Sequence, residues 1–309
     1  MGGLLLTLVG LMGCNNSAEV SLPDTKKVAE RPTAAPSKAP EKAADVVSDK
    51  IYPDLPLELL SPKERETLVQ VTKSQLCPCP KSTVAMHQCL QKPETQCGLA
   101  KSAALTAMQK IKDGLGDKDV LDALGVYIET AYKKHDFDLE GVAHIGDPNA
   151  PVKIVEFADF ECPFCNMART IMKDVMAAHD GQVVLYFKQF PLSFHEHSTS
   201  AACAVLAAQK QGKFWPMYDL IFDNQKSLSE EKIRSLAQAL GLNMDQFLKD
   251  WKDPAVAERV EKEKKEGVDA QVDSTPTFFI NGRKFLGERA TEALSQAVAE
   301  EIKAVKEKK

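Results

Sequence analysis

The sequence predicts an α/β fold that carries an inserted helical subdomain and is preceded by a small cysteine-rich helical domain. Two apolar segments, 152–157 and 183–190, have the length and composition of buried strands and flank a helical segment at 162–179. A longer helical stretch runs from about 196 to 266, and four cysteines lie between 77 and 97. A chain of 309 residues with 44% hydrophobic content is long enough for two such domains.

Charge balance and cysteine content limit the possible partners and compartments. The chain has 39 basic and 44 acidic residues, a net charge of -5 and no basic stripe, which argues against nucleic acid as a partner. Eight cysteines are many for a cytosolic chain of this size. Their number indicates a compartment in which disulfides form and are exchanged.

The N-terminus predicts export and lipidation. Residues 4–12 form an apolar run too short to span a bilayer, and the sequence Leu-Met-Gly-Cys that closes it resembles a lipobox. Residues 1–13 would then be a lipoprotein signal peptide, and Cys14 would carry the lipid that anchors the protein to a bacterial membrane, on its periplasmic side. A plain secretory signal or a buried apolar segment is the alternative. Residues 14–54, rich in Pro, Ala, Lys, Glu and Ser, are predicted to be a disordered tether.

A small helical domain is expected over residues 55–137. The sequence Ser-Pro-Lys-Glu at 61–64 combines an N-cap, a proline in the first turn and an acid at the third position, and later helices are predicted over 99–111 and 118–132. An oxidising compartment favours two disulfides among four cysteines in this domain. Three pairings are open, and a redox relay or a metal site is the alternative use of the four thiols. These residues are Cys77, Cys79, Cys89 and Cys97.

The second domain is predicted to span residues 142–309. Its strand, helix and strand form a βαβ unit, and the helical stretch from about 196 to 266 reads as an insert. Asn281-Gly282 lies between two short strand-like segments and is the strongest short signal for a hairpin. A closing helix is expected from Thr291 to about Val305.

The motif Cys162-Pro163-Phe164-Cys165 carries the chemistry. It lies where an apolar strand gives way to a helix, so the unpaired N–H groups at the helix start should stabilise a Cys162 thiolate. Cys165, one turn later, can attack a mixed disulfide on Cys162 and release the partner. The same spacing also occurs in zinc sites and structural disulfides, but this domain contains no second Cys-x-x-Cys. We therefore expect Cys162 to be the nucleophile and Cys165 the resolving residue of a redox-active disulfide.

Three separated motifs resemble the DsbA-type thioredoxin-fold family. They are the segment 146–151 leading to Cys-Pro-Phe-Cys, Phe-Pro-Leu at 190–192 and Thr-Pro-Thr-Phe-Phe at 275–279, and the similarity covers about 142–302. It implies a thioredoxin fold and thiol-disulfide oxidoreductase activity. Residues 76–132 resemble, more faintly, the three-helix domain of CcmH-type proteins. Those have Cys-x-x-Cys where this chain has Cys-x-Cys, so the similarity does not carry a redox role over to Cys77 and Cys79.

The resemblance also implies roles for three residues near the thiols. Pro276 would be cis and would present the backbone of Thr275 to an extended substrate strand, which is compatible with the small cost of a cis X-Pro bond. An ordinary turn before a strand is the alternative. Glu156 would lie beneath the active site and accept a proton from Cys165. Alternatively, Glu156 faces solvent on a strand edge.

Other residues receive plainer interpretations. His195 and His197 could share a metal ion, but two more ligands would be needed and none is indicated, so we expect a loop before the helical insert. Glu161 is expected to tune local charge at the surface. Cys203, in an apolar helical stretch, is interpreted as a small core residue.

These observations predict an exported thiol-disulfide oxidoreductase that acts on protein thiols without a cofactor or a metal. The oxidase direction is expected, with a membrane partner that reoxidises the pair, and isomerase or reductase activity is the alternative. A hypothesis of another class is a periplasmic metal-handling protein that uses Cys162 and Cys165 as ligands. A third is a binding module in which redox activity is secondary.

Overall fold

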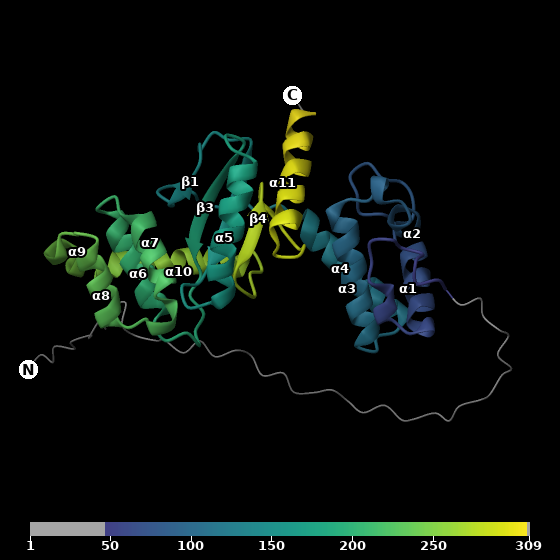
Figure 1. The fold of residues 1–309 in the computed structure, drawn as a ribbon, viewed down its shortest axis with the longest axis horizontal. Helices are drawn as coiled ribbons and strands as arrows, with labels where there is room; N and C mark the ends of the chain where they lie inside the picture. The colour runs from purple at the N-terminus through teal and green to yellow at the C-terminus, as the bar shows by residue number, and fades with distance from the viewer. Residues whose placement is uncertain (1–46, 308–309) are drawn as a thin grey trace, which may run out of the picture. The chain divides into compact units, whose positions relative to one another are not determined.

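The computed structural model describes residues 47–307, which form two compact units divided between Ile128 and Glu129 (Figure 1). The predicted signal peptide, Cys14 and the tether up to residue 46 lie outside the described residues. Each unit is described by itself. Within residues 47–307, no helix is both long enough and apolar enough to cross a bilayer.

The first unit is helical, with two short 3-10 turns. The predicted capping box is present: Ser61 Oγ accepts from the N–H of Glu64, and the Glu64 carboxylate accepts from the N–H of Ser61 at 2.7 Å. Alanines on one face of the third helix pack against leucines and valines of the first. The elements are η1 (Leu57–Leu59), α1 (Pro62–Ser74), α2 (Met86–Leu90), η2 (Pro93–Thr95), α3 (Gly98–Lys112) and α4 (Asp117–Tyr132).

Both boundaries predicted for the helical domain are too late in the chain. Tyr52, assigned to the tether, is only 1% exposed, and its hydroxyl lies 2.5 Å from Thr72 Oγ1 and 2.7 Å from His87 Nδ1. At the other end, Phe137 packs edge-to-face against Phe157 and Phe279 of the second unit. Each boundary depends on one aromatic residue, Tyr52 or Phe137, in an otherwise polar stretch. A single aromatic residue forms no periodic pattern, so the sequence alone did not show where either boundary lies.

The second unit contains a five-stranded sheet in the order β1-β3-β2-β4-β5. The two central strands are parallel and joined by a helix, as the predicted βαβ unit requires, and β4 pairs antiparallel with β2. Asn281 and Gly282, both with positive φ, form the predicted hairpin turn between β4 and β5. The strands are β1 (His144–Ile145), β2 (Val152–Ala158), β3 (Val183–Gln189), β4 (Thr277–Ile280) and β5 (Arg283–Lys284).

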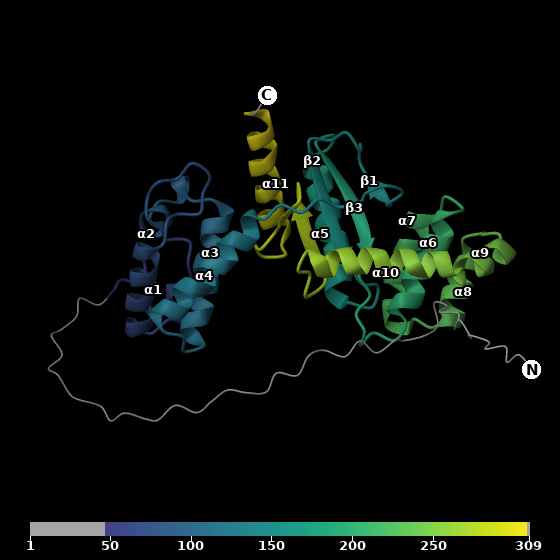
Figure 2. The ribbon, with the colours of Figure 1, turned by 180° about the vertical axis from the view of Figure 1, so that it is seen from behind.

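Helices cover both faces of this sheet. Helices α5 (Pro163–Ala178) and α11 (Thr291–Lys306) lie on one face and α10 (Pro254–Asp269) crosses the other, as the two opposite views show (Figures 1 and 2). Side chains alternate along β2, so Ile154 contacts the α5 side and Phe157 the α10 side. At Gly267 a Cβ atom would lie 2.7 Å from the Phe190 ring, so glycine permits the close approach of α10 to the sheet.

The predicted helical insert is present and consists of several helices. They share a core that includes Phe160, Cys162 and Cys165, so the insert packs directly against the active-site segment. Helix α6 is buried on almost every side. The elements are α6 (Ser198–Gln209), α7 (Phe214–Asp223), η3 (Gln225–Ser227), α8 (Glu230–Ala239) and α9 (Met244–Trp251), followed by α10.

Candidate active site

Cys162 is the N-cap of α5, directly after the turn that follows β2. Its backbone is extended, Pro163 occupies the first helical position, where no N–H partner is needed, and the N–H of Cys165 donates to the Cys162 carbonyl at 3.0 Å. The two thiols are the free cysteines among the described residues, and both are buried. The sequence therefore places one thiol at the positive end of a helix and the other one turn inside it.

The two thiols have opposite acidities. A hydrogen bond from the Cys165 thiol lowers the pKa of Cys162 to about 5, against the opposing effect of burial. Thr275 and the backbone N–H groups of Cys165 and Phe164 lower this pKa further. Burial raises the pKa of Cys165 well above its usual value, and the same hydrogen bond adds to that rise. At neutral pH the reduced pair thus consists of a thiolate at Cys162 and a thiol at Cys165.

The loop that contains Thr275 and Pro276 lies against Cys162. The peptide bond between them is cis, and Cys162 Sγ, in its protonated form, donates to the Thr275 carbonyl oxygen at 3.3 Å. The buried Thr275 hydroxyl has no hydrogen-bond partner within residues 47–307. The loop before β4 therefore brings a backbone carbonyl to the Cys162 sulfur.

Glu156 is fully enclosed in β2 and does not face solvent. It pairs with Phe187 on one side and Phe278 on the other, and neither carboxylate oxygen has a hydrogen-bond partner in the described part of the chain. Burial raises the pKa of Glu156 to about 8, and its charge raises the pKa of Cys165. A carboxyl group with this pKa can take up or release a proton near neutral pH.

Asp159 connects the turn before Cys162 to the loop before α6. Its carboxylate accepts from the N–H of Glu161 at 2.7 Å, the N–H of Leu192 at 2.7 Å and Nδ1 of His195 at 2.9 Å. The Asp159 backbone N–H also donates to Cys165 Sγ at 3.4 Å. Sequence reasoning missed this residue, although an acid directly after a buried strand and before the Cys-x-x-Cys motif was a usable signal.

Gln225 holds the same turn from the helical insert. Its amide nitrogen donates to the carbonyl oxygens of Phe160 at 2.8 Å and Cys162 at 2.9 Å. Asn166, one residue beyond the motif, donates to the carbonyl of Phe222 at 3.0 Å. The position of Cys162 is therefore fixed by contacts from the sheet, from the loop before β4 and from the insert.

The family model described as Thioredoxin matches residues 138–300, which is more than half of the chain. The chain belongs to the thioredoxin family. The predicted thioredoxin fold is thereby confirmed.

Two curated relatives and three solved structures illustrate the similarity. The Na(+)/H(+) antiporter NhaA of Herminiimonas arsenicoxydans is 40% identical over 147 residues, which are 47% of this chain and 23% of the antiporter. The Na(+)/H(+) antiporter NhaA 3 of Salinispora tropica is 36% identical over 157 residues, which are 50% of this chain and 24% of that antiporter. The chain thus spans about a quarter of the length of these curated relatives. One structure is a thioredoxin-like oxidoreductase from Silicibacter pomeroyi, with 26% identity, a TM-score of 0.47 and a match over 53% of this chain and 93% of that one. BdbD from Bacillus subtilis has 23% identity, a TM-score of 0.48 and a match over 55% of this chain and 97% of that one. For alpha-DsbA1 from Wolbachia pipientis, the identity is 19%, the TM-score is 0.49 and the match covers 56% of this chain and 96% of that one.

Large apolar side chains are exposed on the segments around the thiols of this thioredoxin-family chain. Phe164, between the two cysteines, is 62% exposed, Met167 on the next turn 61%, and Phe194 in the loop before α6 77%. The neighbouring His195 contacts Asp159, and the N–H of His197 donates to the Glu161 carboxylate at 2.6 Å. Glu161 therefore also helps to hold this loop against the active-site turn, which its expected surface role did not include.

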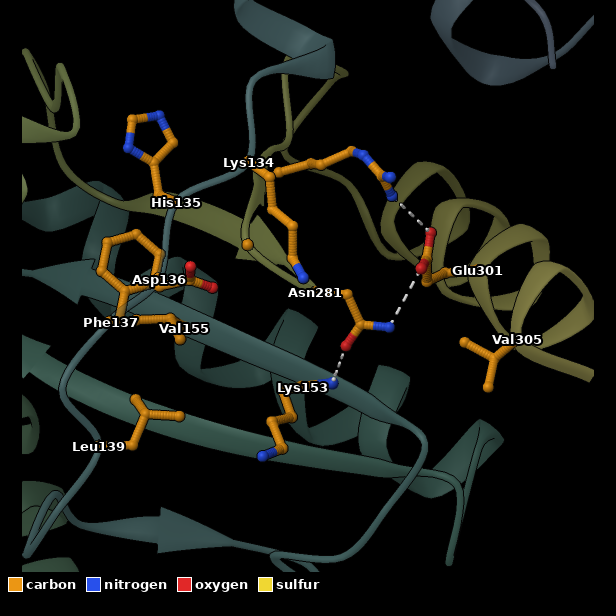
Figure 3. Close-up of a pocket in the computed structure, with 12 residues that line it drawn as sticks. Lys134, His135, Asp136, Phe137, Leu139, Lys153, Val155, Asn281, Glu301 and Val305 are labelled. Atoms are coloured by element: carbon orange, nitrogen blue, oxygen red, sulfur yellow. Dashed lines mark hydrogen bonds and ion pairs between the residues drawn. The ribbon is translucent and has the colours of Figure 1, made fainter. Parts of the chain in front are cut away.

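A pocket of about 460 Å³ lies at the start of β2, whereas the thiols follow its end. Figure 3 shows Asn281 between two partners: it accepts from the N–H of Lys153 at 2.8 Å and donates to Glu301 at 3.1 Å. Arg283 also pairs with Glu301, at 3.5 Å. These contacts hold the hairpin turn to β2 and α11, so we assign this pocket a structural role in the thioredoxin fold rather than a place in the thiol site.

Five further cysteines lie among the described residues. In the helical unit the structure pairs Cys77 with Cys89 and Cys79 with Cys97, one of the three pairings left open by the sequence. Cys203 is fully buried in α6, as expected of a core residue, and it is not a free thiol.

Proposed function

We propose that this protein is a thiol-disulfide oxidoreductase that oxidises protein thiols through Cys162 and Cys165. The observation that carries the proposal is the asymmetry of the pair: a thiol of lowered pKa is the N-cap of α5, beside a cis-proline loop, and a fully buried thiol of raised pKa follows it. A single attacking sulfur and a protected resolving sulfur are what sequential disulfide exchange needs.

In the oxidase direction a substrate thiolate attacks Cys162 Sγ of the Cys162–Cys165 disulfide. A bond forms between the substrate sulfur and Cys162, and Cys165 leaves with the electron pair and takes a proton, for which Glu156 is the nearby carboxyl group. A second substrate thiolate then attacks the substrate sulfur and displaces Cys162, which leaves as a stabilised thiolate. The substrate gains a disulfide and the pair gains two electrons and one proton at neutral pH.

The pKa of Cys162 supports the oxidase direction. A leaving group with a lowered pKa departs faster, and a stabilised thiolate favours the reduced form of the pair, which makes its disulfide more oxidising. Isomerase or reductase activity would use the same atoms from the reduced state. Thr275 and Pro276 would align an extended substrate segment beside Cys162 in either direction.

Location and partners follow as part of the same proposal. A disulfide donor acts in an oxidising compartment and needs an oxidant to restore its disulfide. We therefore propose an exported protein with lipid attached at Cys14, held at a bacterial membrane where a membrane partner reoxidises it. The rival metal-handling function predicts that metal copurifies in proportion to the Cys162–Cys165 pair. Metal-free protein with full disulfide-exchange activity would exclude it.

The redox equilibrium of the full chain with glutathione tests the direction. Acid-quenched samples are alkylated and the label on the peptide containing Cys162 and Cys165 is measured, so the other disulfides do not enter. A potential near the value of about -120 mV for DsbA would support an oxidase, whereas one near about -270 mV, as in thioredoxin, would overturn that direction. Replacing Cys162 with serine should abolish exchange, and retention of exchange in that variant would contradict the proposed function itself.

A further inference from the structure

The two disulfides of the helical unit lie against each other. Cys79 Sγ, which is bonded to Cys97, is 3.6 Å from Cys89 Sγ, which is bonded to Cys77. The sulfur atoms of Cys77, Cys79 and Cys89 all lie within 4.8 Å of one another. A thiolate formed at Cys79 would therefore already contact the sulfur of a second disulfide.

The two bridges differ in their access to solvent. Cys77 and Cys89 are 5% and 1% exposed, whereas Cys79 and Cys97 are partly exposed. A reductant in solution thus reaches the Cys79–Cys97 bridge more easily than the buried one. An exchange that starts at the Cys79–Cys97 bridge can then continue at the buried Cys77–Cys89 bridge.

The surroundings of the Cys79–Cys97 bridge favour its reduction. Cys97 is the N-cap of α3, a helix of 15 residues, so the helix N-terminus would stabilise a thiolate there. The N–H of Cys97 also donates to Cys79 Sγ at 3.1 Å, which stabilises negative charge on Cys79. Both sulfurs of this bridge can therefore leave as thiolates.

We infer that the two disulfides form one exchangeable four-sulfur unit, in which Cys79, once released from Cys97, displaces Cys77 from Cys89. A dithiol attacks Cys79 and Cys97 leaves as a thiolate; the second thiol of the dithiol then closes its own disulfide and releases Cys79. The Cys79 thiolate attacks Cys89 Sγ, a Cys79–Cys89 bond forms, the Cys77–Cys89 bond breaks and Cys77 leaves as a thiolate. The dithiol supplies two electrons, and the internal exchange consumes none.

This site makes the helical unit a second redox-active element of the chain. Its reducing partner would be a dithiol able to reach Cys79 and Cys97 at the surface. After exchange, Cys77 and Cys97 would be the free thiols, so the unit would present a different pair of thiols from the pair first reduced.

A cysteine replacement tests the internal exchange without any reductant. In the full chain with Cys162 and Cys165 replaced by alanine, Cys97→Ser leaves Cys79 free beside the Cys77–Cys89 bridge. The free thiol is alkylated at acid pH, the disulfides are then reduced and alkylated with a second reagent, and trypsin releases residues 74–81 with both Cys77 and Cys79 on one peptide. We expect at least roughly one part in ten of the label on Cys77, equivalent to two pairings within about tenfold in stability. Label on Cys79 alone would overturn the inference.

A matched variant and a time course complete the experiment. Cys79→Ser in the same background removes the attacking sulfur, so label should appear on Cys97 and the Cys77–Cys89 bridge should stay intact. If Cys97→Ser does not fold, the chain with its four N-terminal cysteines is treated with limiting dithiothreitol and quenched at intervals. A transient Cys79–Cys89 linkage with free Cys77 and Cys97 would support the exchange, and independent loss of the two original bridges without that linkage would overturn it.

Discussion

The thiol of Cys162 donates a hydrogen bond to the carbonyl oxygen of Thr275 at 3.3 Å, across 113 positions of sequence. This contact joins the start of α5 to the loop before β4, in which the peptide bond between Thr275 and Pro276 is cis. The Thr275 hydroxyl is buried without a partner within residues 47–307, so it could donate to a thiolate. In the proposed function, Cys162 thus lies where a substrate backbone and a substrate sulfur would arrive together.

The acidity of Cys162 should depend on the side chain at position 165. Because the hydrogen bond from Cys165 contributes most to the lowered pKa, Cys165→Ala should move the pKa of Cys162 upward from about 5, and Cys165→Ser, which keeps a donor, should move it less. The pH dependence of alkylation by iodoacetamide, monitored on the Cys162 peptide, gives these values. Equal midpoints in both variants and the wild type would mean that the helix backbone alone sets the acidity.

The equilibrium between the Cys162–Cys165 pair and glutathione should shift toward the reduced pair as pH rises. Between about pH 5 and pH 8 Cys162 has lost its proton in the reduced folded protein but still holds it in the unfolded chain. The reduced folded form therefore gains stability as pH rises through this window, and it loses that stability as pH falls through about 5. The equilibrium constant for reducing the Cys162–Cys165 disulfide with glutathione should rise about tenfold per pH unit in this window. The quenched alkylation assay measures it from pH 4 to pH 8. A flat profile would show that Cys162 is protonated in the reduced protein.

Glu156 should reduce the stability of the protein as pH rises. Its raised pKa means that the folded state holds a proton that the unfolded chain loses above its usual pKa, so the stability due to this group is present at low pH and lost by about pH 8. In the oxidised protein, Glu156→Gln should raise Tm by about 2–4 °C or more at pH 8 and by less at pH 5. Glu258→Gln, on the exposed side of α10, is the control and should change neither value.

The same variant tests the proton transfer. Without a carboxyl group at 156, Cys165 loses the base that we propose takes its proton when it attacks a mixed disulfide. The rate of that attack should fall by about 10-fold or more, and the pKa of Cys162, set by other groups, should stay near about 5. Single-turnover release of a mixed-disulfide peptide gives the rate. An unchanged rate would limit Glu156 to its effect on stability.

The sequence was sufficient for those parts of the site that are close together in the chain. Cys162 and Cys165 lie in one motif at the end of an apolar segment, so their strand-to-helix setting could be read locally. The positions of Thr275 and Pro276 came from the family resemblance, since nothing in their own residues specifies which loop they face. β1 was not predicted because two residues, His144 and Ile145, are too few for any periodicity.

Contacts between distant segments could not be predicted. Asp159, His195 and Gln225 belong to three segments that meet only because the insert folds back on the end of β2. The disulfide pairing in the helical unit likewise depends on how α2 and α3 place Cys89 and Cys97, and spacing alone permits three pairings. Local propensity determines the elements, and packing determines which side chains meet.

Asp159 provides a test of such a contact. Its carboxylate accepts from two backbone N–H groups and from His195, and an amide in its place would direct an NH2 group at one of these donors. Because a buried donor would lose its partner, Asp159→Asn should lower the free energy of unfolding of the oxidised protein by about 1–3 kcal/mol in urea denaturation. Asp147→Asn is the matched control: this exposed carboxylate also accepts from a backbone N–H, that of Asn149, and its loss should change stability by less than about 0.5 kcal/mol.

Equal stability of the two variants would show that the loop before α6 is held without Asp159. A loss confined to Asp159→Asn, together with a raised pKa of Cys162, would show that this buried carboxylate positions the turn on which the nucleophile depends.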